Sequence, residues 1–348
     1  MKSYQFREYG GPLGLADGPT PEPAGTEVLI RVRACGLCHS DLHLWQGYFE
    51  MGGGRRLDVR AVRELPFTLG HEIVGEVAAA GPDAEDVDIG DARVVFPWIG
   101  CGACGFCDAD REHLCHRPRA LGTHLDGGFA DHVIVPHPRY LFDFGDIAPE
   151  LAGTYACSGL TAYSALRKAE RWLEDQLVII GAGGVGLAGI QLAKALFDVD
   201  LIVVEVDDAK LDAARQAGAA HVVDAREDDA SRQLKKLTKG GCAAVVDFAG
   251  SSASAALGFR TVAKSGTLVV VGLLGGSLSV PIPLLVLKDL AVQGSDLGSL
   301  REMAELMELV RAGRVDPIPY ATRPMDEAEA SLRNLEAGRV VGRVVLTV

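Results

Sequence analysis

A glycine-rich turn between an apolar strand and a helix constrains the fold of this chain more than any other feature. The segment QLVIIGAGGVGLAGIQLAKAL, residues 176–196, begins with an apolar run, turns at Gly181, Gly183 and Gly186, and continues with apolar residues at helical spacing. The first glycine permits the tight turn, the second lets a phosphate approach the backbone, and the third allows the helix to pack closely on the strand. Because the amides at a helix N-terminus attract anions, the segment predicts a loop that binds a dinucleotide pyrophosphate.

An acidic residue at the end of the next expected strand supports this interpretation. Glu205 ends the segment LIVVE, 19 residues after Gly186, where a carboxylate can accept hydrogen bonds from an adenosine ribose. Together with Asp207 and Asp208 it would repel a 2′-phosphate, and no arginine stands nearby in the sequence. The pattern therefore predicts NAD rather than NADP. Further cofactor contacts are expected from Gly184, Val185 and Gly272.

The sequence pattern divides the chain into two parts. Residues 151–286 alternate apolar strand-like runs with helical segments, the helices being expected near 208–217 and 253–263. This alternation predicts an α/β domain with a doubly wound parallel sheet, which is assigned to NAD binding. Residues 1–150 contain short strand-like segments separated by Gly and Pro, which indicates a mostly β catalytic domain, and residues 287–348 are expected to rejoin it. A chain of 348 residues exceeds the size of one growing core, so two domains are expected.

Composition excludes several classes of function. The formal net charge is −13, whereas nucleic-acid binding requires a basic surface, and the same charge disfavours adsorption to anionic membranes. The longest apolar runs, such as 268–271 and 284–287, are too short to cross a bilayer, and the N-terminus has no secretory apolar region. We therefore expect a cytoplasmic protein that acts on a small molecule. In that reducing compartment, eight cysteines are expected to serve metals or chemistry rather than disulfides.

Four of those cysteines share one short segment. CGACGFCDADREHLC places Cys101, Cys104, Cys107 and Cys115 in a C-x2-C-x2-C-x7-C array. Four thiolates can surround a tetrahedral zinc ion and leave no open position, so the array predicts a structural zinc. An iron–sulfur cluster is the main alternative. Its usual fourth cysteine after three residues, followed by Pro, is absent here.

A second group of ligand-type residues follows the first long strand. The segment CGLCHSDLH contains Cys35, Cys38, His39, Ser40, Asp41 and His43. A catalytic zinc needs about three protein ligands and one open position. The candidates are Cys38, His71 in LGHEIVG, and Cys157 in YACSGLTAY at the junction of the two domains. A redox role for the Cys35–Cys38 pair is disfavoured, because Cys38 is a candidate zinc ligand and the strand alternation directs Cys35 elsewhere.

The order of these motifs resembles that of the zinc-dependent, medium-chain alcohol dehydrogenases. The resemblance runs through GLCHSDLH, LGHEIVGEV, the four-cysteine segment, CSGLTAY, GAGGVG and the terminal GRVVLTV, and so covers nearly the whole chain. It implies a GroES-like catalytic domain beside a Rossmann-type domain, two zinc ions per chain, and NAD. It also implies a homodimer or homotetramer with pairing between the coenzyme-domain sheets. The catalytic zinc would be held by Cys38, His71 and Cys157.

The resemblance further implies roles for the residues around the zinc. Glu72 would lie behind the metal, and Asp41 would orient His71 through its other ring nitrogen. Ser40 would hydrogen-bond the substrate oxygen, and His43 would pass its proton to solvent through the cofactor ribose. Cofactor contacts are implied for His39 at the pyrophosphate, Lys210 at the ribose and Arg343 at the phosphates.

The expected activity is the reversible, NAD-dependent oxidation of an alcohol to a ketone or aldehyde by hydride transfer. Ser40, being smaller than threonine, leaves room for a secondary, cyclic or bulky alcohol. A polyol dehydrogenase is an alternative, although a glutamate would be expected in place of Cys157. A silent NAD-sensing zinc protein is another, and it would be expected to lack some of Cys38, His71, Ser40 and His43. For Trp98 a wall of the substrate pocket is favoured, with a place in the core as the alternative.

One segment departs from the family pattern. The connection between His43 and His71 is long and includes a Gly/Arg-rich loop at 47–65. This loop carries three successive glycines, followed by Arg55, Arg56, Arg60 and Arg63. Its basic charge could recognise an anionic group on a specialised substrate, or the loop could pack on a neighbouring subunit. A solvated surface excursion is the third alternative.

Overall fold

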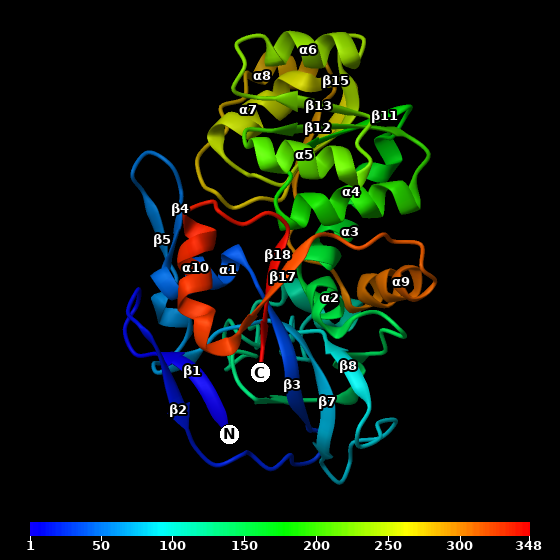
Figure 1. Ribbon diagram of the computed structural model, residues 1–348. Coiled ribbons are helices and arrows are strands. Elements are labelled where there is room, and N and C mark those ends of the chain that lie inside the picture. The colour runs from blue at the N-terminus through cyan, green and yellow to red at the C-terminus, as the bar shows by residue number, and fades with distance from the viewer.

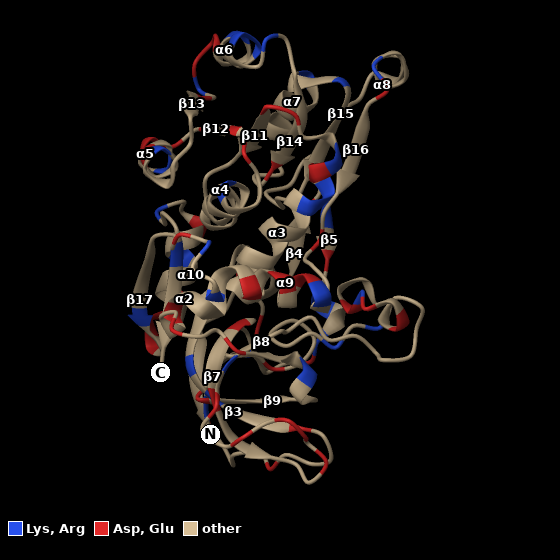
Figure 2. Ribbon diagram, turned by 90° about the vertical axis from the view of Figure 1, so that its right-hand side faces the viewer, with Lys and Arg blue, Asp and Glu red and all other residues tan.

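The computed structural model describes residues 1–348, which form two large sheets (Figure 1) and two small ones. A cavity lined by residues of both parts lies between the large sheets. A parallel sheet covered by helices stands above a mostly antiparallel sheet, as Figure 1 shows. The predicted fold class, a mostly β part combined with a doubly wound α/β part, is confirmed. No helix is long and apolar enough to cross a membrane. Lys and Arg positions are interspersed with Asp and Glu positions over both parts (Figure 2).

The parallel sheet contains six strands in the spatial order β13-β12-β11-β14-β15-β16. They are β11 (Gln176–Ile180), β12 (Asp200–Glu205), β13 (His221–Asp224), β14 (Cys242–Asp247), β15 (Val262–Val270) and β16 (Ala291–Gly294). The order reverses between β11 and β14, because the chain runs from β11 to β12 on one side and returns from β13 to β14 on the other, so a crevice opens at their carboxyl ends. Because β16 follows residue 287, this sheet extends beyond the boundary expected from the sequence.

Helices cover both faces of the parallel sheet. Alternate side chains of β11 are buried in two different clusters: Leu177 and Ile179 in one, Val178 and Ile180 in the other. The first cluster packs on α3 (Ser158–Ala169), α4 (Gly184–Leu196) and α5 (Asp208–Ala217). The second packs on α6 (Ala230–Leu237) and α7 (Ser252–Thr261). Burial on both faces explains why these strands are continuously apolar in the sequence.

The antiparallel sheet is built around one long central strand. Its strands are β3 (Val28–Leu37), β7 (Glu72–Ala80), β8 (Ala92–Val95), β9 (His132–Val135), β10 (Leu141–Phe142), β17 (Tyr320–Pro324) and β18 (Arg343–Thr347). β3 pairs with β7 along one edge, and along the other edge with β9 in its first half and β18 in its second half. The end of the chain therefore lies in the sheet that its first part begins (Figure 1).

The remaining elements surround these two sheets. They are β1 (Lys2–Phe6), β2 (Leu13–Asp17), β6 (Phe67–Thr68), the hairpin β4 (Tyr48–Glu50) with β5 (Arg56–Asp58), and the helices α1 (His39–Gln46), α2 (Pro149–Ala152), α8 (Ile282–Leu287), α9 (Leu300–Arg311) and α10 (Ala328–Glu336). The β4–β5 hairpin occupies the Gly/Arg-rich loop. Its tip meets the coenzyme part at Gly52, where a Cβ atom would lie 2.8 Å from the backbone of Gly276. Only glycine permits this close contact between the two parts of the molecule.

Candidate active site

Three ligand-type residues from three elements meet between the two sheets. Cys38 lies at the junction of β3 and α1, His71 precedes β7, and Cys157 precedes α3. Antiparallel pairing of Gly36 with Glu72 brings the first two to the same end of the sheet. The ligand atoms of Cys38, His71 and Cys157 all lie within 4.8 Å of one another, and all three residues are buried. The hydrogen bond between the sulfur atoms of Cys38 and Cys157 lowers the pKa of the Cys38 thiol.

The arrangement of these three residues fits a zinc ion. The sulfur atoms of Cys38 and Cys157 are 3.9 Å apart. Two thiolates at about 2.3 Å from one tetrahedral zinc would lie about 3.8 Å apart. The Nε2 atom of His71 is buried without a hydrogen-bond partner in the protein, although buried polar atoms are generally paired. A metal at the centre of the cluster would satisfy that nitrogen.

Asp41 fixes the orientation of the His71 ring. Its Oδ1 atom lies 3.2 Å from His71 Nδ1 and accepts a hydrogen bond of 3.1 Å from the backbone amide of Gly70. Its Oδ2 atom accepts a hydrogen bond of 2.9 Å from the amide of Cys38. The carboxylate, itself fully buried, thus joins two of the candidate ligands and leaves Nε2 of His71 available to a metal.

A buried ion pair lies behind the cluster. One oxygen of Glu72 accepts a hydrogen bond of 3.2 Å from the amide of Ser158, and the other pairs with the guanidinium of Arg343. Arg343 begins β18 and passes directly beneath Gly184, where any side chain would collide with it. The structure therefore places Arg343 against the glycine loop, as expected for a phosphate contact, but it also gives the guanidinium a carboxylate partner. Burial raises the pKa of Glu72.

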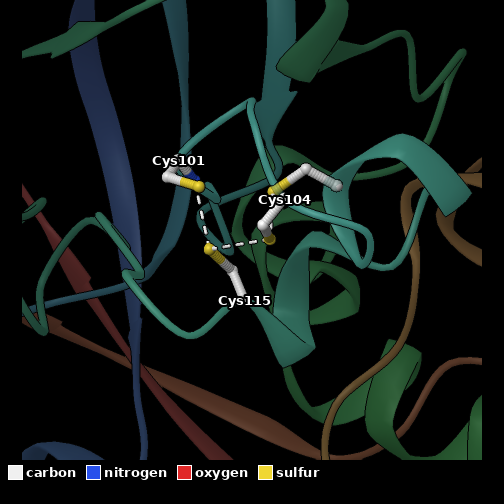
Figure 3. A group of neighbouring side chains, drawn as sticks. Cys101, Cys104 and Cys115 are labelled. Atoms are coloured by element: carbon white, nitrogen blue, oxygen red, sulfur yellow. Dashed lines mark hydrogen bonds between the residues drawn. The ribbon is translucent and has the colours of Figure 1, made fainter.

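The four-cysteine segment forms a second ligand cluster. The ligand atoms of Cys101, Cys104, Cys107 and Cys115 lie within 4.8 Å of one another, and Figure 3 shows three of these side chains converging. The sulfur of Cys104 is 3.6 Å from that of Cys107 and 3.8 Å from that of Cys115, again the spacing of thiolates on one zinc. Hydrogen bonding from the amide of Cys107 lowers the pKa of Cys104 to about 6, which favours its thiolate. All eight cysteines of the chain are free of disulfides.

One cavity of about 660 Å³ joins the catalytic cluster to the glycine loop. The predicted residues that line it are Cys38, His39, Ser40, His43, Cys157, Gly181, Gly183, Gly184, Val185, Gly186, Glu205, Lys210, Gly272 and Arg343. Asp41, His71 and Glu72 lie fully buried behind this lining. The cavity is long enough to run from the Cys38–Cys157 cluster to Glu205 at the end of β12. An elongated dinucleotide fits a cleft of this form.

Sequence reasoning missed part of the lining. Phe248 and Ala249 follow β14, and Ala225 follows β13, all at the carboxyl edge of the parallel sheet. The ends of these strands were the available signal, because ligands of doubly wound sheets bind at that edge. The expectation that no arginine stands near Glu205 is wrong for the folded protein. Arg226 lies one strand away, since Glu205 and Asp224 are register partners in β12 and β13.

Glu205 has a structural role besides facing the cavity. Its two carboxylate oxygens accept hydrogen bonds of 2.7 Å from the amides of Ala182 and Val206. The acid therefore fixes the turn after β11 relative to the end of β12. The hydrogen bond from the amide of Ala182 orients the glycine loop toward the cavity.

A second cavity of about 950 Å³ adjoins the first near Gly272 and Asp296. The β4–β5 hairpin, the cysteine segment, α3 and the start of α9 contribute to its walls. Phe49 of the hairpin contacts the ring of His43, with the ring centroids 4.7 Å apart. Burial lowers the pKa of His43, so its imidazole is neutral at pH 7 and can accept a proton.

The arginines of the hairpin segment are mostly engaged within the protein. Arg56 pairs with Glu50 at 2.8 Å, and Arg60 pairs with Asp58 at 2.6 Å. Arg63 is buried and donates hydrogen bonds to the carbonyl oxygens of Thr123 and Leu44. Arg55, which is exposed, is the one arginine of the segment whose side chain has no partner to keep it from an anionic substrate group.

Trp98 does not line either cavity, contrary to expectation. Its indole Nε1 donates a hydrogen bond of 2.9 Å to the carbonyl of Ala156, and its ring centroid lies 5.1 Å from that of His71. The side chain is buried and supports the ligand residues from behind. The backbone carbonyl that anchors it is 58 positions away in sequence, so the pattern around FPWIGCG could not reveal this contact.

Comparison with known proteins agrees with the two-part architecture and the two cysteine clusters. A family model described as alcohol dehydrogenase GroES-like domain matches residues 24–145, and one described as zinc-binding dehydrogenase matches residues 184–312. The combination defines a zinc-binding dehydrogenase architecture.

Full-length relatives identify the family. An NAD-dependent alcohol dehydrogenase of Sulfurisphaera tokodaii is 39% identical, with 99% of each chain covered. One of Saccharolobus solfataricus is 37% identical over the same share. The solved alcohol dehydrogenase of Aeropyrum pernix superposes with a TM-score of 0.90 at 32% identity, covering 100% of both chains. The chain belongs to the zinc-dependent, medium-chain alcohol dehydrogenase family.

Proposed function

We propose that the protein is an NAD-dependent alcohol dehydrogenase with one catalytic and one structural zinc. The observation that carries this proposal is the single cavity that joins the Cys38–His71–Cys157 cluster to the glycine loop. A hydride can pass between substrate and nicotinamide only if both reach one enclosed space, and this cavity connects the two binding regions. The names of the relatives support the same activity.

The residues around the cluster have complementary roles in this proposal. When bound, zinc supplies a Lewis acid that lowers the pKa of the substrate hydroxyl. Ser40, on the cavity wall, accepts the hydroxyl proton, and neutral His43 receives it on the path to solvent. Asp41 holds His71 in the tautomer that presents Nε2 to the metal. Glu205 and Lys210 hold the adenosine ribose, with Gly183, where a Cβ atom would meet open space, leaving room for the pyrophosphate.

The proposed substrate is a secondary, cyclic or bulky alcohol. The second cavity, about 950 Å³, adjoins the first and gives such a substrate room. An anionic alcohol is less well supported, because Arg56, Arg60 and Arg63 are engaged within the protein. A silent NAD-sensing protein is disfavoured, since both the ligand set and the Ser40–His43 pair line the same cavity.

The homo-oligomer and the location are also part of the proposal. β16 leaves one edge of the parallel sheet unpaired, and α8 beside it exposes Ile282, Val286 and Leu287 by 74%, 71% and 73% (Figure 2). We propose that a second copy covers this edge, in a homodimer or in a homotetramer of such dimers. A cytoplasmic location would keep the cysteines of both clusters reduced. In the proposed domain division, β16 belongs with the NAD-binding domain.

The first experiment is to measure zinc content together with NADH formation on a panel of primary, secondary and cyclic alcohols. We expect two zinc ions per chain and turnover with NAD. Cys38→Ser should lose one zinc and lower turnover by about a hundred-fold or more. Cys242→Ser is the matched control, because Cys242 is a buried thiol in β14 that belongs to neither cluster. Full turnover in Cys38→Ser, or one zinc in the unaltered protein, would contradict the assignment.

A further inference from the structure

An arginine lies at the rim of the adenosine end of the cavity. Arg226 follows β13, whose last residue, Asp224, is the register partner of Glu205 in β12. The amide of the intervening Ala225 donates a hydrogen bond of 2.9 Å to the carbonyl of Glu205. Ala225 and Glu227, on either side of Arg226, line the cavity together with Glu205. Arg226 is therefore within one residue of the wall that would face the ribose.

Two aspartates hold the guanidinium of this arginine. Nε donates to both carboxylate oxygens of Asp224, at 2.9 and 3.0 Å, and Nη2 donates to Asp224 at 2.6 Å. Nη2 also pairs with Asp208, in the first turn of α5. The carboxylates come from two different elements, α5 and β13, and both bond the same Nη2 atom. We call Asp208, Asp224 and Arg226 the Arg226 cluster.

The chemistry of NADP explains what these pairs could prevent. NADP differs from NAD by a 2′-phosphate on the adenosine ribose, the group that Glu205 would face. A guanidinium with free donors is the side chain best suited to bind a phosphate in two-point fashion. In the Arg226 cluster Nε and Nη2 of the guanidinium are directed at carboxylates, and the cluster as a whole carries a net negative charge.

We propose that Asp208 and Asp224 are specificity determinants that exclude NADP by holding Arg226 away from the 2′-phosphate position. This inference rests on the proposed use of NAD and adds a second barrier to the one formed by Glu205. Glu205 repels the phosphate directly, whereas the two aspartates withhold the cation that could bind it. A suitable arginine is thus already present, and its partners determine whether it can act.

The Arg226 cluster can be altered without loss of the fold. Asp208 is 81% exposed and Arg226 is 48% exposed, and exposed ion pairs contribute little to stability. The test uses a Glu205→Gln background, which removes the direct repulsion but keeps an acceptor for the amide of Ala182. To this background we add Asp208→Asn with Asp224→Asn, and then Arg226→Gln as a third change.

The readout is the binding of two small probes, 2′,5′-ADP and ADP, measured by calorimetry at fixed low salt. The pair of aspartate substitutions should tighten 2′,5′-ADP binding on the order of ten-fold or more relative to the Glu205→Gln background. ADP binding should change by less than about three-fold, because ADP has no 2′-phosphate. Adding Arg226→Gln should abolish the gain. The kcat/KM for NADP should follow the same order.

Two results would overturn the inference. One is no tightening of 2′,5′-ADP binding after the aspartate substitutions. The other is a tightening of 2′,5′-ADP binding that persists after Arg226→Gln. That result would mean that the loss of the aspartate charges strengthens binding without help from the arginine. Failure of the unaltered protein to bind ADP or to use NAD would instead refute the proposed function, and this inference with it.

Discussion

Among single residues, Asp41 has the greatest influence on the catalytic cluster. Its carboxylate contacts His71 and the amides of Gly70 and Cys38, so it fixes two candidate ligands at once. Residues that orient a metal-bound histidine commonly affect metal affinity as much as they affect structure. A substitution that removes the charge of Asp41 but keeps the shape of its side chain therefore separates its effect on metal affinity from its effect on structure.

Asp41→Asn should weaken binding of the catalytic zinc by about ten-fold to a hundred-fold. The amide can hydrogen-bond through one oxygen only, so it cannot accept from His71 and both backbone amides as the carboxylate does. Competition with a chelator, followed by zinc analysis, measures the change. Asp131→Asn is the matched control, since Asp131 contacts His132 in a similar pair at the surface. Equal zinc retention in the two variants would contradict the role given to Asp41.

The sequence predicted the composition of the site better than its contacts. Thiols and imidazoles are chemically distinctive, so Cys38, His71 and Cys157 could be selected from their residue types and surroundings. The ion pair of Glu72 with Arg343 joins residues far apart in the chain, and the position of Arg226 depends on strand pairing. Such contacts follow from the topology, which residue types alone do not specify.

Among the elements, the cysteine segment 101–115 depends most on a ligand. It contains only short 3-10 turns, at Cys107–Ala109 and Glu112–Leu114, and no regular helix or strand. Segments of this kind bury few apolar side chains, and a structural zinc then supplies much of their folding free energy. The segment also forms part of the wall of the second cavity, through Arg111 and His113.

Cys104→Ser should therefore remove the structural zinc while leaving the catalytic one in place. We expect a lower melting temperature and faster proteolytic cleavage within 101–115, with the Cys38 cluster still able to bind metal. Zinc analysis combined with limited proteolysis measures both effects, and Cys242→Ser serves as the control. Retention of two zinc ions by Cys104→Ser would show that the four thiols do not form one site.

Elements with a strong periodic pattern could be predicted, and those fixed by distant contacts could not. The helix expected at 208–217 coincides with α5, and the one expected near 253–263 lies within two residues of α7. The β4–β5 hairpin was not foreseen, because three successive glycines have no strand propensity. Its tip is instead held by the contact between Gly52 and Gly276, which belongs to the other part of the molecule.

For the whole molecule, the exposed edge formed by β16 and α8 predicts association. Ile282, Val286 and Leu287 form an apolar group next to an unpaired strand, and such surfaces are normally covered. Val286→Asp with Leu287→Asp should dissociate the oligomer into monomers, as measured by sedimentation velocity. Ile89→Asp is the matched control, because Ile89 is 66% exposed and belongs to the part of the molecule that holds the mostly antiparallel sheet. A monomeric unaltered protein would contradict the proposed interface.

The position of β18 has a consequence for how the protein is made. β3 emerges from the ribosome early, yet one edge of its second half, residues 34–37, is paired only by β18, which begins at Arg343. At 5–20 residues per second, that edge waits on the order of fifteen seconds to a minute. A nascent chain in this interval presents an open, apolar strand to its neighbours, so β3 is a natural target for chaperone binding. Stalled chains that end before Arg343 should remain sensitive to protease in the first 145 residues, whereas early protection there would show that the sheet forms without its closing strand.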